Sequence, residues 1–227
     1  MSLILQIETA TTVCSVALSE NGNVLAYKEI QQRNVHAEVI TLFIDEVLKM
    51  ADKQYGDLSA VAVSCGPGSY TGLRIGISVT KGLCYSLDIP FIAIETLEAM
   101  TDGMITEAAA DNALFCPMID ARRMEVFTAV FDADGNRVKP TSAEIIDQDS
   151  FSDLLKANKI IFFGDGAAKC KEILGTNANA HIIPDFQNSA KYLTKKAAEK
   201  FAAKDFEDTA YFEPYYLKDF IAGKKSV

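Results

Sequence analysis

The sequence predicts an α/β fold in which one β-β-β-α-β-α unit occurs twice. Short apolar strands alternate with amphipathic helices along the chain, as is typical of this class. Each half opens with a strand that ends in an acid, Glu8 or Asp120, and continues into a hairpin with a glycine at its turn, Gly22 or Gly135. The acids lie 112 residues apart and the glycines 113, so the two halves share one register.

The elements of each unit follow from their apolar runs and turn signals. In the first unit we expect strands at residues 3–9, 13–18, 24–30, 60–63 and 91–94, and helices at 36–50 and 72–86. In the second we expect strands at 114–120, 124–131, from 137 onward and 159–163, and helices at 149–156 and after 167. A hinge at 101–112 would separate two domains, 1–104 and 105–227, and a closing helix at 188–204 would let the last segment pack back on the first domain.

Size and composition describe an ordinary globular chain of 227 residues, 49% hydrophobic and 23% charged. The net charge of −9 argues against a chain that holds nucleic acid by itself, because phosphate contacts dominate such affinity. The apolar start lacks basic residues and is interrupted at Gln6 and Glu8, which argues against a signal peptide, and no stretch is long enough to cross a membrane. Five cysteines without paired spacing indicate a reduced, cytoplasmic protein.

The most informative segment runs from Ser64 to Gly76, where an apolar strand turns through Gly-Pro into a helix. Gly66, Gly68 and Gly72 lack the Cβ that would block a tight turn or a close backbone approach. Their spacing is one residue longer than the dinucleotide-binding fingerprint, and no Lys-Ser or Lys-Thr pair completes a Walker loop. Two interpretations stay open: a helix N-terminus presented to an anion, or a tight turn with close helix packing.

A duplicated unit of this order resembles the fold of actin, sugar kinases and heat-shock ATPases, in which two ribonuclease-H-like domains face each other over a nucleotide cleft. In that fold an acid ends the first strand of each half, and glycine-rich hairpins clasp the phosphates. The acids are present here, but the loops at residues 9–13 and 121–124 hold no glycine to wrap a phosphate. We therefore predict a degenerate nucleotide cleft, formed by Glu8, Thr9, Gly66, Gly68, Asp120, Gly164, Asp165 and Gly166.

Five segments, in order along almost the whole chain, resemble the TsaB (YeaZ) family of glycoprotease-like proteins. They are ILQIET at 4–9, GPGSYTGLRIG at 66–76 with Lys81-Gly82, DARRMEV at 120–126, GDGA at 164–167 and EPYYLKDF at 213–220. The resemblance implies a non-catalytic paralogue that binds the TsaD subunit. It would be required, alongside the small ATPase TsaE, for transfer of threonylcarbamoyl to N6 of the adenosine beside the tRNA anticodon. Glu8, Tyr70 and Lys218 depart from the family pattern of Asp, Phe and Arg.

The histidines also indicate a role without catalysis. The catalytic paralogue carries an H-x-x-x-H metal pair on its first helix, whereas here Ile40 stands four residues after His36. The other histidine, His181, is expected in a distant loop, so we predict neither a metal site nor a catalytic residue. No Ser-His-Asp or Cys-His set is readable, which argues against peptidase activity. We expect no tightly bound cofactor; the resemblance leaves open ATP or ADP at the partner interface.

Two helices are candidates for a partner interface. The apolar face of helix 36–50 is wider than one side of a sheet requires, and helix 72–86 presents small residues beside aliphatic ones. Deep burial in the core is one interpretation; the resemblance favours a four-helix contact with the paralogous helices of TsaD. The residues expected in that contact are His36, Val39, Ile40, Phe43, Gly72, Ile75, Gly76, Val79 and Leu83. A bulky charged residue at Gly76 is then expected to abolish partner binding without unfolding the chain.

The predicted function is therefore that of a scaffold in the tRNA-modifying assembly, with tRNA contacted only indirectly. Without TsaD the same helical face would allow a homodimer. The alternative is a free-standing ATPase or phosphotransferase of the actin and sugar-kinase fold, against which the missing phosphate-loop glycines argue.

Overall fold

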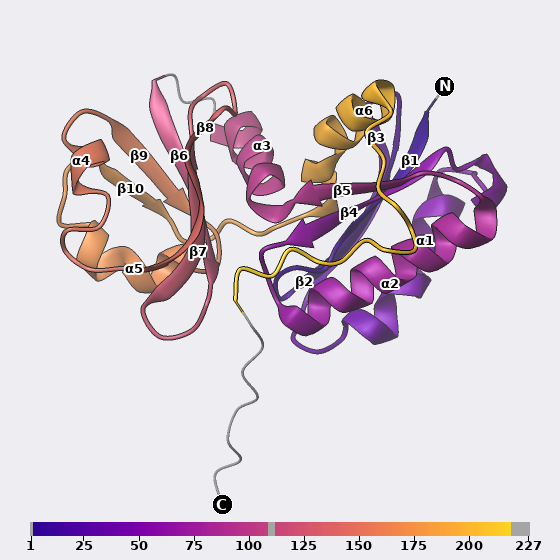
Figure 1. Cartoon of the computed structure of the whole chain (residues 1–227), viewed down its shortest axis with the longest axis horizontal. Helices are drawn as coiled ribbons and strands as arrows, with labels where there is room; N and C mark the ends of the chain where they lie inside the picture. The colour runs from indigo at the N-terminus through magenta and orange to yellow at the C-terminus, as the bar shows by residue number, and fades with distance from the viewer. Residues whose placement is uncertain (1, 109–111, 219–227) are drawn as a thin grey trace, which may run out of the picture.

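Residues 2–108 and 112–218 are described by a computed structural model, which shows two β-sheets with helices packed on and between them (Figure 1). The first sheet has five strands in the order β3-β2-β1-β4-β5. The central strand β1 pairs antiparallel with β2 and parallel with β4. The strands are β1 (Leu3–Glu8), β2 (Val13–Glu20), β3 (Asn23–Gln31), β4 (Ala60–Gly66) and β5 (Phe91–Glu95).

Both faces of the first sheet are covered by helices. One face packs against α1 (His36–Met50) and α2 (Tyr70–Leu87), which contact each other, and a short 3₁₀ turn, η1 (Tyr55–Asp57), follows α1. Side chains alternate along β1, so Leu5 lies in the core beneath these helices while Ile4 lies in the core on the opposite face. Burial on both faces explains why β1 reads as an almost continuous apolar run.

The second sheet repeats the first. Its order from one edge is β10-β9-β6-β7-β8, which matches β5-β4-β1-β2-β3 strand for strand, with the same parallel and antiparallel pairings. The strands are β6 (Ala113–Asp120), β7 (Glu125–Phe131), β8 (Arg137–Ile145), β9 (Lys159–Phe163) and β10 (Ala180–Ile183), with helices α4 (Ser152–Leu155) and α5 (Ala167–Leu174). The predicted duplication of the β-β-β-α-β-α unit is confirmed.

The last helix of each half crosses to the other half. Helix α3 (Thr96–Ala108) follows the first sheet but contacts β6 and β7, as well as β4 and β5. The 3₁₀ turn η2 (Ala190–Leu193) and helix α6 (Thr194–Ala203) follow the second sheet but contact β1, and α6 also contacts β5. Gly103 of α3 lies against the ring of Tyr192 in η2, where a Cβ would be 2.5 Å from ring carbons. Helix α3 and η2 thus pack on each other, and Figure 1 shows α3 between the two sheets.

Four sequence-based expectations differ from the structure. Residues 101–108 of the expected hinge are helical, because the apolar side chains of α3 are held in the core between the halves. The closing helix is divided into η2 and α6, and only Ser152–Leu155 of the expected helix 149–156 is α-helical. His181 lies in β10, beside β9, and not in a loop; four residues between turn-forming neighbours gave too short a pattern to read as a strand.

The segment after α6, residues 205–218, runs back over the first sheet and α2 towards the second sheet (yellow in Figure 1). Glu207 pairs with Phe91 at the free edge of β5, and the ring of Phe212 packs edge-on against that of Phe91, with centroids 4.8 Å apart. The backbone N–H of Tyr215 donates to the carbonyl of Cys65, at 2.8 Å. We call these residues the C-terminal segment.

Candidate functional site

Glu8, the acid that ends β1, is completely buried. Its Oε1 accepts hydrogen bonds from the backbone N–H of Ala10, at 2.6 Å, and from the hydroxyl of Ser64 on β4, at 2.8 Å. Burial raises the pKa of Glu8 to about 7, although these hydrogen bonds favour the charged form and lower it. Glu8 therefore fixes the turn after β1 and ties it to β4.

The glycines of the β4–α2 connection make room for this chain's own backbone. A Cβ at Gly68 would lie 2.5 Å from the carbonyl oxygen of Ala10, and one at Gly72 would collide with the carbonyl oxygen of Thr9. Gly66 has a φ of +121°, and a Cβ there would collide with the carbonyl oxygen of Tyr215 in the C-terminal segment. Of the two interpretations left open by the sequence, the structure supports a tight turn with close packing.

The second half treats its acid in a related way. Asp120, at the end of β6, accepts a hydrogen bond from the backbone N–H of Arg122 at 2.8 Å and pairs with Lys169 of α5. Its own backbone N–H donates to the carboxylate of Asp165 at 3.0 Å, and burial raises the pKa of Asp165. Gly164, with a φ of +101°, packs against the carbonyl oxygen of Met118, with which a Cβ would collide. Gly164 and Asp165 thus form a tight strand-to-helix turn.

One small cavity lies in the cleft between the halves. The cavity there measures about 20 Å³, whereas cofactor sites usually span about 300–1,000 Å³. A space of this size accommodates a single water molecule. It is lined by Thr11, Thr12, Val13, Gln31, Met100, Gly164, Asp165, Phe186, Gln187 and Asn188.

Of the eight predicted cleft residues, only Gly164 and Asp165 reach this cavity; the others do not line it. Sequence reasoning missed Phe186 and Asn188, which precede η2 and enter the cleft only because η2 crosses to the first sheet. No local sequence pattern marks them. By contrast, the aromatic residues of the EPYYLKDF run do indicate from the sequence that the C-terminal segment packs on the rest of the protein.

His36 serves as an anchor at the start of α1. It is buried, and its Nε2 lies 3.1 Å from the carbonyl oxygen of Thr11 and 3.2 Å from that of Val13, so it can donate to the loop after β1. Among the described residues no group of three His, Cys, Asp or Glu side chains could hold a metal ion.

The predicted partner interface needs correction, because five of its residues lie inside this chain. On α1, the side chains of His36, Ile40 and Phe43 are buried. On α2, Gly72 and Gly76 face the sheet. A Cβ at Gly76 would collide with the hydroxyl of Thr9 and lie 3.3 Å from Val63, so a bulky residue there would disrupt the fold. The expectation that such a variant stays folded is wrong.

The small residues of α2 are needed for close packing on the first sheet, as the deep-core interpretation proposed. The remaining predicted residues are half-buried at the margin of the core: Val39, Ile75, Val79 and Leu83. Three further residues of the two helices, which sequence reasoning missed, are open to solvent. Leu42 is 56% exposed and Tyr85 86%, and a Cβ at Gly82 would meet no atom within 4 Å. We call these seven residues the α1–α2 surface.

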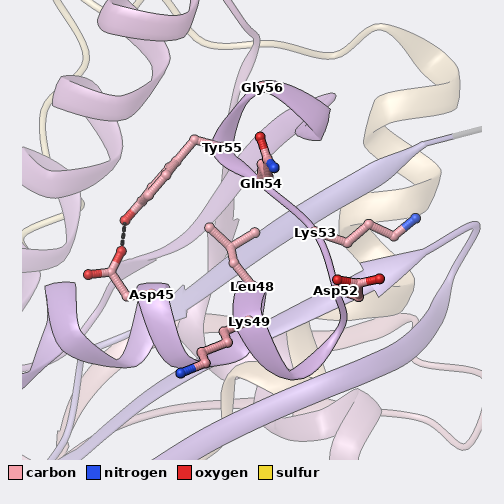
Figure 2. Close-up of a pocket in the computed structure, with 8 residues that line it drawn as sticks. All are labelled: Asp45, Leu48, Lys49, Asp52, Lys53, Gln54, Tyr55 and Gly56. Atoms are coloured by element: carbon pink, nitrogen blue, oxygen red, sulfur yellow. Dashed lines mark hydrogen bonds between the residues drawn. The ribbon is translucent and has the colours of Figure 1, made fainter.

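A larger hollow of about 550 Å³ lies at the C-terminal end of α1 (Figure 2). The hydroxyl of Tyr55 donates to the carboxylate of Asp45 at 2.6 Å, and Lys53 pairs with Glu20 outside the hollow. Figure 2 shows the side chains of Lys49 and Lys53 pointing in different directions. The polar groups that line the hollow do not converge on one point, and we assign the hollow no role.

Comparisons with known proteins identify relatives of this chain. The family model of tRNA N6-adenosine threonylcarbamoyltransferase, TsaD, matches residues 23–222. The chain is 38% identical to the tRNA threonylcarbamoyladenosine biosynthesis protein TsaB of Escherichia coli over 135 residues, which are 60% of this chain and 57% of that protein. It is 27% identical to TsaB of Haemophilus influenzae over 98% of this chain and 96% of that protein.

The chain belongs to the TsaB (YeaZ) family. A crystal structure from Pseudomonas aeruginosa, described as similar to the peptidase YeaZ, superimposes with a TM-score of 0.84 at 23% identity and covers 96% of this chain and 100% of that one. The fold is that of actin-like proteins and sugar kinases: an Arthrobacter glucomannokinase superimposes with a TM-score of 0.50 over 90% of this chain. Within the described residues no helix has the length and apolar character to span a membrane.

Proposed function

We propose that this chain is the non-catalytic partner of TsaD in the assembly that places threonylcarbamoyl on N6 of the adenosine beside the tRNA anticodon. The observation that carries the proposal is the use of the cleft residues for internal contacts. Glu8 bonds Ala10 and Ser64, Gly68 and Gly72 pack on residues 9–10, and the cavity between the halves measures about 20 Å³. The name of the TsaB relatives, tRNA threonylcarbamoyladenosine biosynthesis proteins, supports the pathway.

The α1–α2 surface supplies the contact with TsaD in this proposal. On α1, half-buried Val39 lies about one turn before exposed Leu42, and α2 likewise carries both half-buried aliphatic residues and exposed Tyr85. Gly82 is an exposed glycine inside α2, where glycine costs about 1 kcal/mol relative to alanine. That cost is understandable if a partner helix approaches α2 closely at this point. In the absence of TsaD, the same surface would join two copies of this chain.

The other components follow from the same proposal. TsaE would bind the larger assembly, and ATP or ADP would bind at the interface with a partner rather than in this chain's own cleft. The tRNA would be held mainly by TsaD. A role in tRNA modification would place the chain in the cytoplasm. A free-standing ATPase or phosphotransferase is the competing function. ATP turnover by the isolated chain would support it.

Co-elution of paired variants with TsaD tests the contact. Gly82→Arg places a long side chain on the α1–α2 surface, and Gly56→Arg places the same side chain on η1; neither glycine has an atom within 4 Å of the added Cβ. We expect both variants to fold, Gly82→Arg to elute apart from TsaD, and Gly56→Arg to elute with it. If both variants bind TsaD as the parent chain does, the contact lies elsewhere.

A further inference from the structure

The turn between β6 and β7 holds two adjacent arginines in the left-handed region of backbone conformation. Arg122 has a φ of 71° and Arg123 a φ of 47°. Nine non-glycine residues in the described part of the chain have a positive φ, and five of them are Asn or Asp, which tolerate it best. The other hairpin turns place Asn21-Gly22 and Gly135 at such positions. Arginine in this backbone conformation is strained, and Asn or Gly in the same turn would avoid that strain.

The acids beside this turn are already neutralised by lysines. Asp120 pairs with Lys169 of α5, and Glu125 pairs with Lys218 of the C-terminal segment. The side chains of Arg122 and Arg123 are exposed and form no hydrogen bond or ion pair among the described residues. Even with the carboxylate of Asp165 nearby, cations outnumber carboxylates around this turn, in a chain whose net charge is −9.

Aromatic side chains lie on and beside the segment that carries Lys218. Tyr216 is two residues before Lys218, a distance of at most about 7 Å along an extended chain. Its hydroxyl accepts a hydrogen bond from Arg74 at 3.0 Å, its ring is 4.8 Å from that of Tyr70, and the Arg74 guanidinium lies 4.0 Å from the Tyr70 centroid. Cations beside aromatic side chains are what proteins use to bind nucleic acid strands that are not base-paired.

We propose that the β6–β7 turn binds phosphate groups of an RNA backbone through Arg122 and Arg123. Guanidinium groups bind phosphate oxygens through paired N–H donors. Here both guanidinium groups extend from a turn that is exposed to solvent. A free nucleotide offers the same phosphate chemistry. Arg122 and Arg123 are exposed and do not line the small cavity of the cleft, so a strand arriving from solvent fits better. That the RNA is a tRNA rests on the function proposed above.

The test is a pair of double variants in the complete chain, assembled with TsaD. Arg122→Asn/Arg123→Gly removes both guanidinium groups and installs residues that favour a positive φ. Lys159→Ala/Lys171→Ala is the matched control, because it removes two other exposed cations without an ion pair among the described residues. Binding of labelled, unmodified tRNA is titrated across salt concentrations, and ATP binding is measured in parallel.

We expect the arginine variant to bind tRNA several-fold more weakly, and its plot of log affinity against log salt to be shallower by about 2, one for each phosphate that is no longer neutralised. Its Tm should equal the parent value or exceed it by about 2–4 °C, because the strain is relieved. The control should keep the parent slope. ATP binding should be unchanged in all three proteins.

Three results would overturn the inference: a parent-like affinity and slope in the arginine variant, an equal loss in the lysine control, or a loss confined to ATP. Co-elution with TsaD is checked before each titration, and the chain alone is titrated with the same tRNA. A parent chain that does not join TsaD contradicts the proposed function, whereas unaltered tRNA binding by the arginine variant contradicts only the phosphate site.

Discussion

Gly76 of α2 faces the hydroxyl of Thr9 so closely that a Cβ at residue 76 would collide with it. The same helix carries Gly82 six residues later, about 1.7 turns, with no atom within 4 Å of the corresponding position. The two glycines of one helix therefore have different roles. Gly76 lets α2 approach the first sheet, and Gly82 leaves the outer face of α2 flat.

Alanine at these two positions should change stability in opposite directions. Gly76→Ala should lower the free energy of unfolding by about 1–3 kcal/mol, because the added methyl overpacks a filled site. Gly82→Ala should raise it by about 0.5–1 kcal/mol, because alanine favours an exposed helix. Chemical denaturation of both variants measures the difference. Equal effects would contradict the packing described for α2.

Glu8 should make the protein less stable as pH rises through neutrality. Its pKa is about 7 in the folded state, against 4.5 for an unperturbed glutamate, so the folded state binds the proton more tightly. The stabilisation is complete below pH 4.5 and is lost as pH rises past 7, by about 3 kcal/mol at most. Asp165, whose pKa is also raised by burial, adds to the same trend.

Glu8→Gln should therefore flatten, but not abolish, the fall in the free energy of unfolding between pH 5 and pH 8. The glutamine keeps an oxygen to accept from Ala10 and Ser64 and does not titrate. Denaturation curves at several pH values test this. If the variant and the parent chain lose stability in parallel, Glu8 does not titrate in this range.

The C-terminal segment should contribute measurably to stability through Phe212. Phe212→Ala removes the ring that packs on Phe91 and should cost about 2 kcal/mol, less than for a fully buried ring. Tyr211→Ala is the matched control, because Tyr211 is 84% exposed. Limited proteolysis should release the segment faster only in the first variant. Equal cleavage of the two variants would show that the segment is not held at Phe91.

An ion pair between the halves should be worth more than one on the surface. Arg137 of β8 reaches Glu95 at 3.1 Å and Glu98 at 2.9 Å, and its guanidinium lies 5.2 Å from the centroid of Phe131. Arg137→Ala should lower the free energy of unfolding by about 1–2 kcal/mol, because the variant gives up ring packing and two carboxylate partners together. Lys156→Ala should change little, because Lys156 is 74% and its partner Asp153 93% exposed. Thermal melts at low and high salt compare the two.

Much of the fold could be predicted because its signals are local. The Asn21-Gly22 turn and the alternating strands beside it define β2 and β3, and their repetition around Gly135 exposed the duplication. The direction in which Gly72 and Gly76 face could not be read, because small residues suit a sheet and a partner helix equally well. The crossing of α3 and α6, and with it the entry of Asn188 into the cleft, depends on contacts between distant segments that no local pattern encodes.

The central claim is most directly tested by an omission assay. TsaD, TsaE, threonylcarbamoyl-adenylate, ATP and unmodified tRNA are combined with and without this chain, and N6-threonylcarbamoyladenosine is quantified. The account predicts modification that depends on the chain, together with no ATP turnover by the chain alone. Equal modification in its absence, or ATP turnover by the isolated chain, would contradict it.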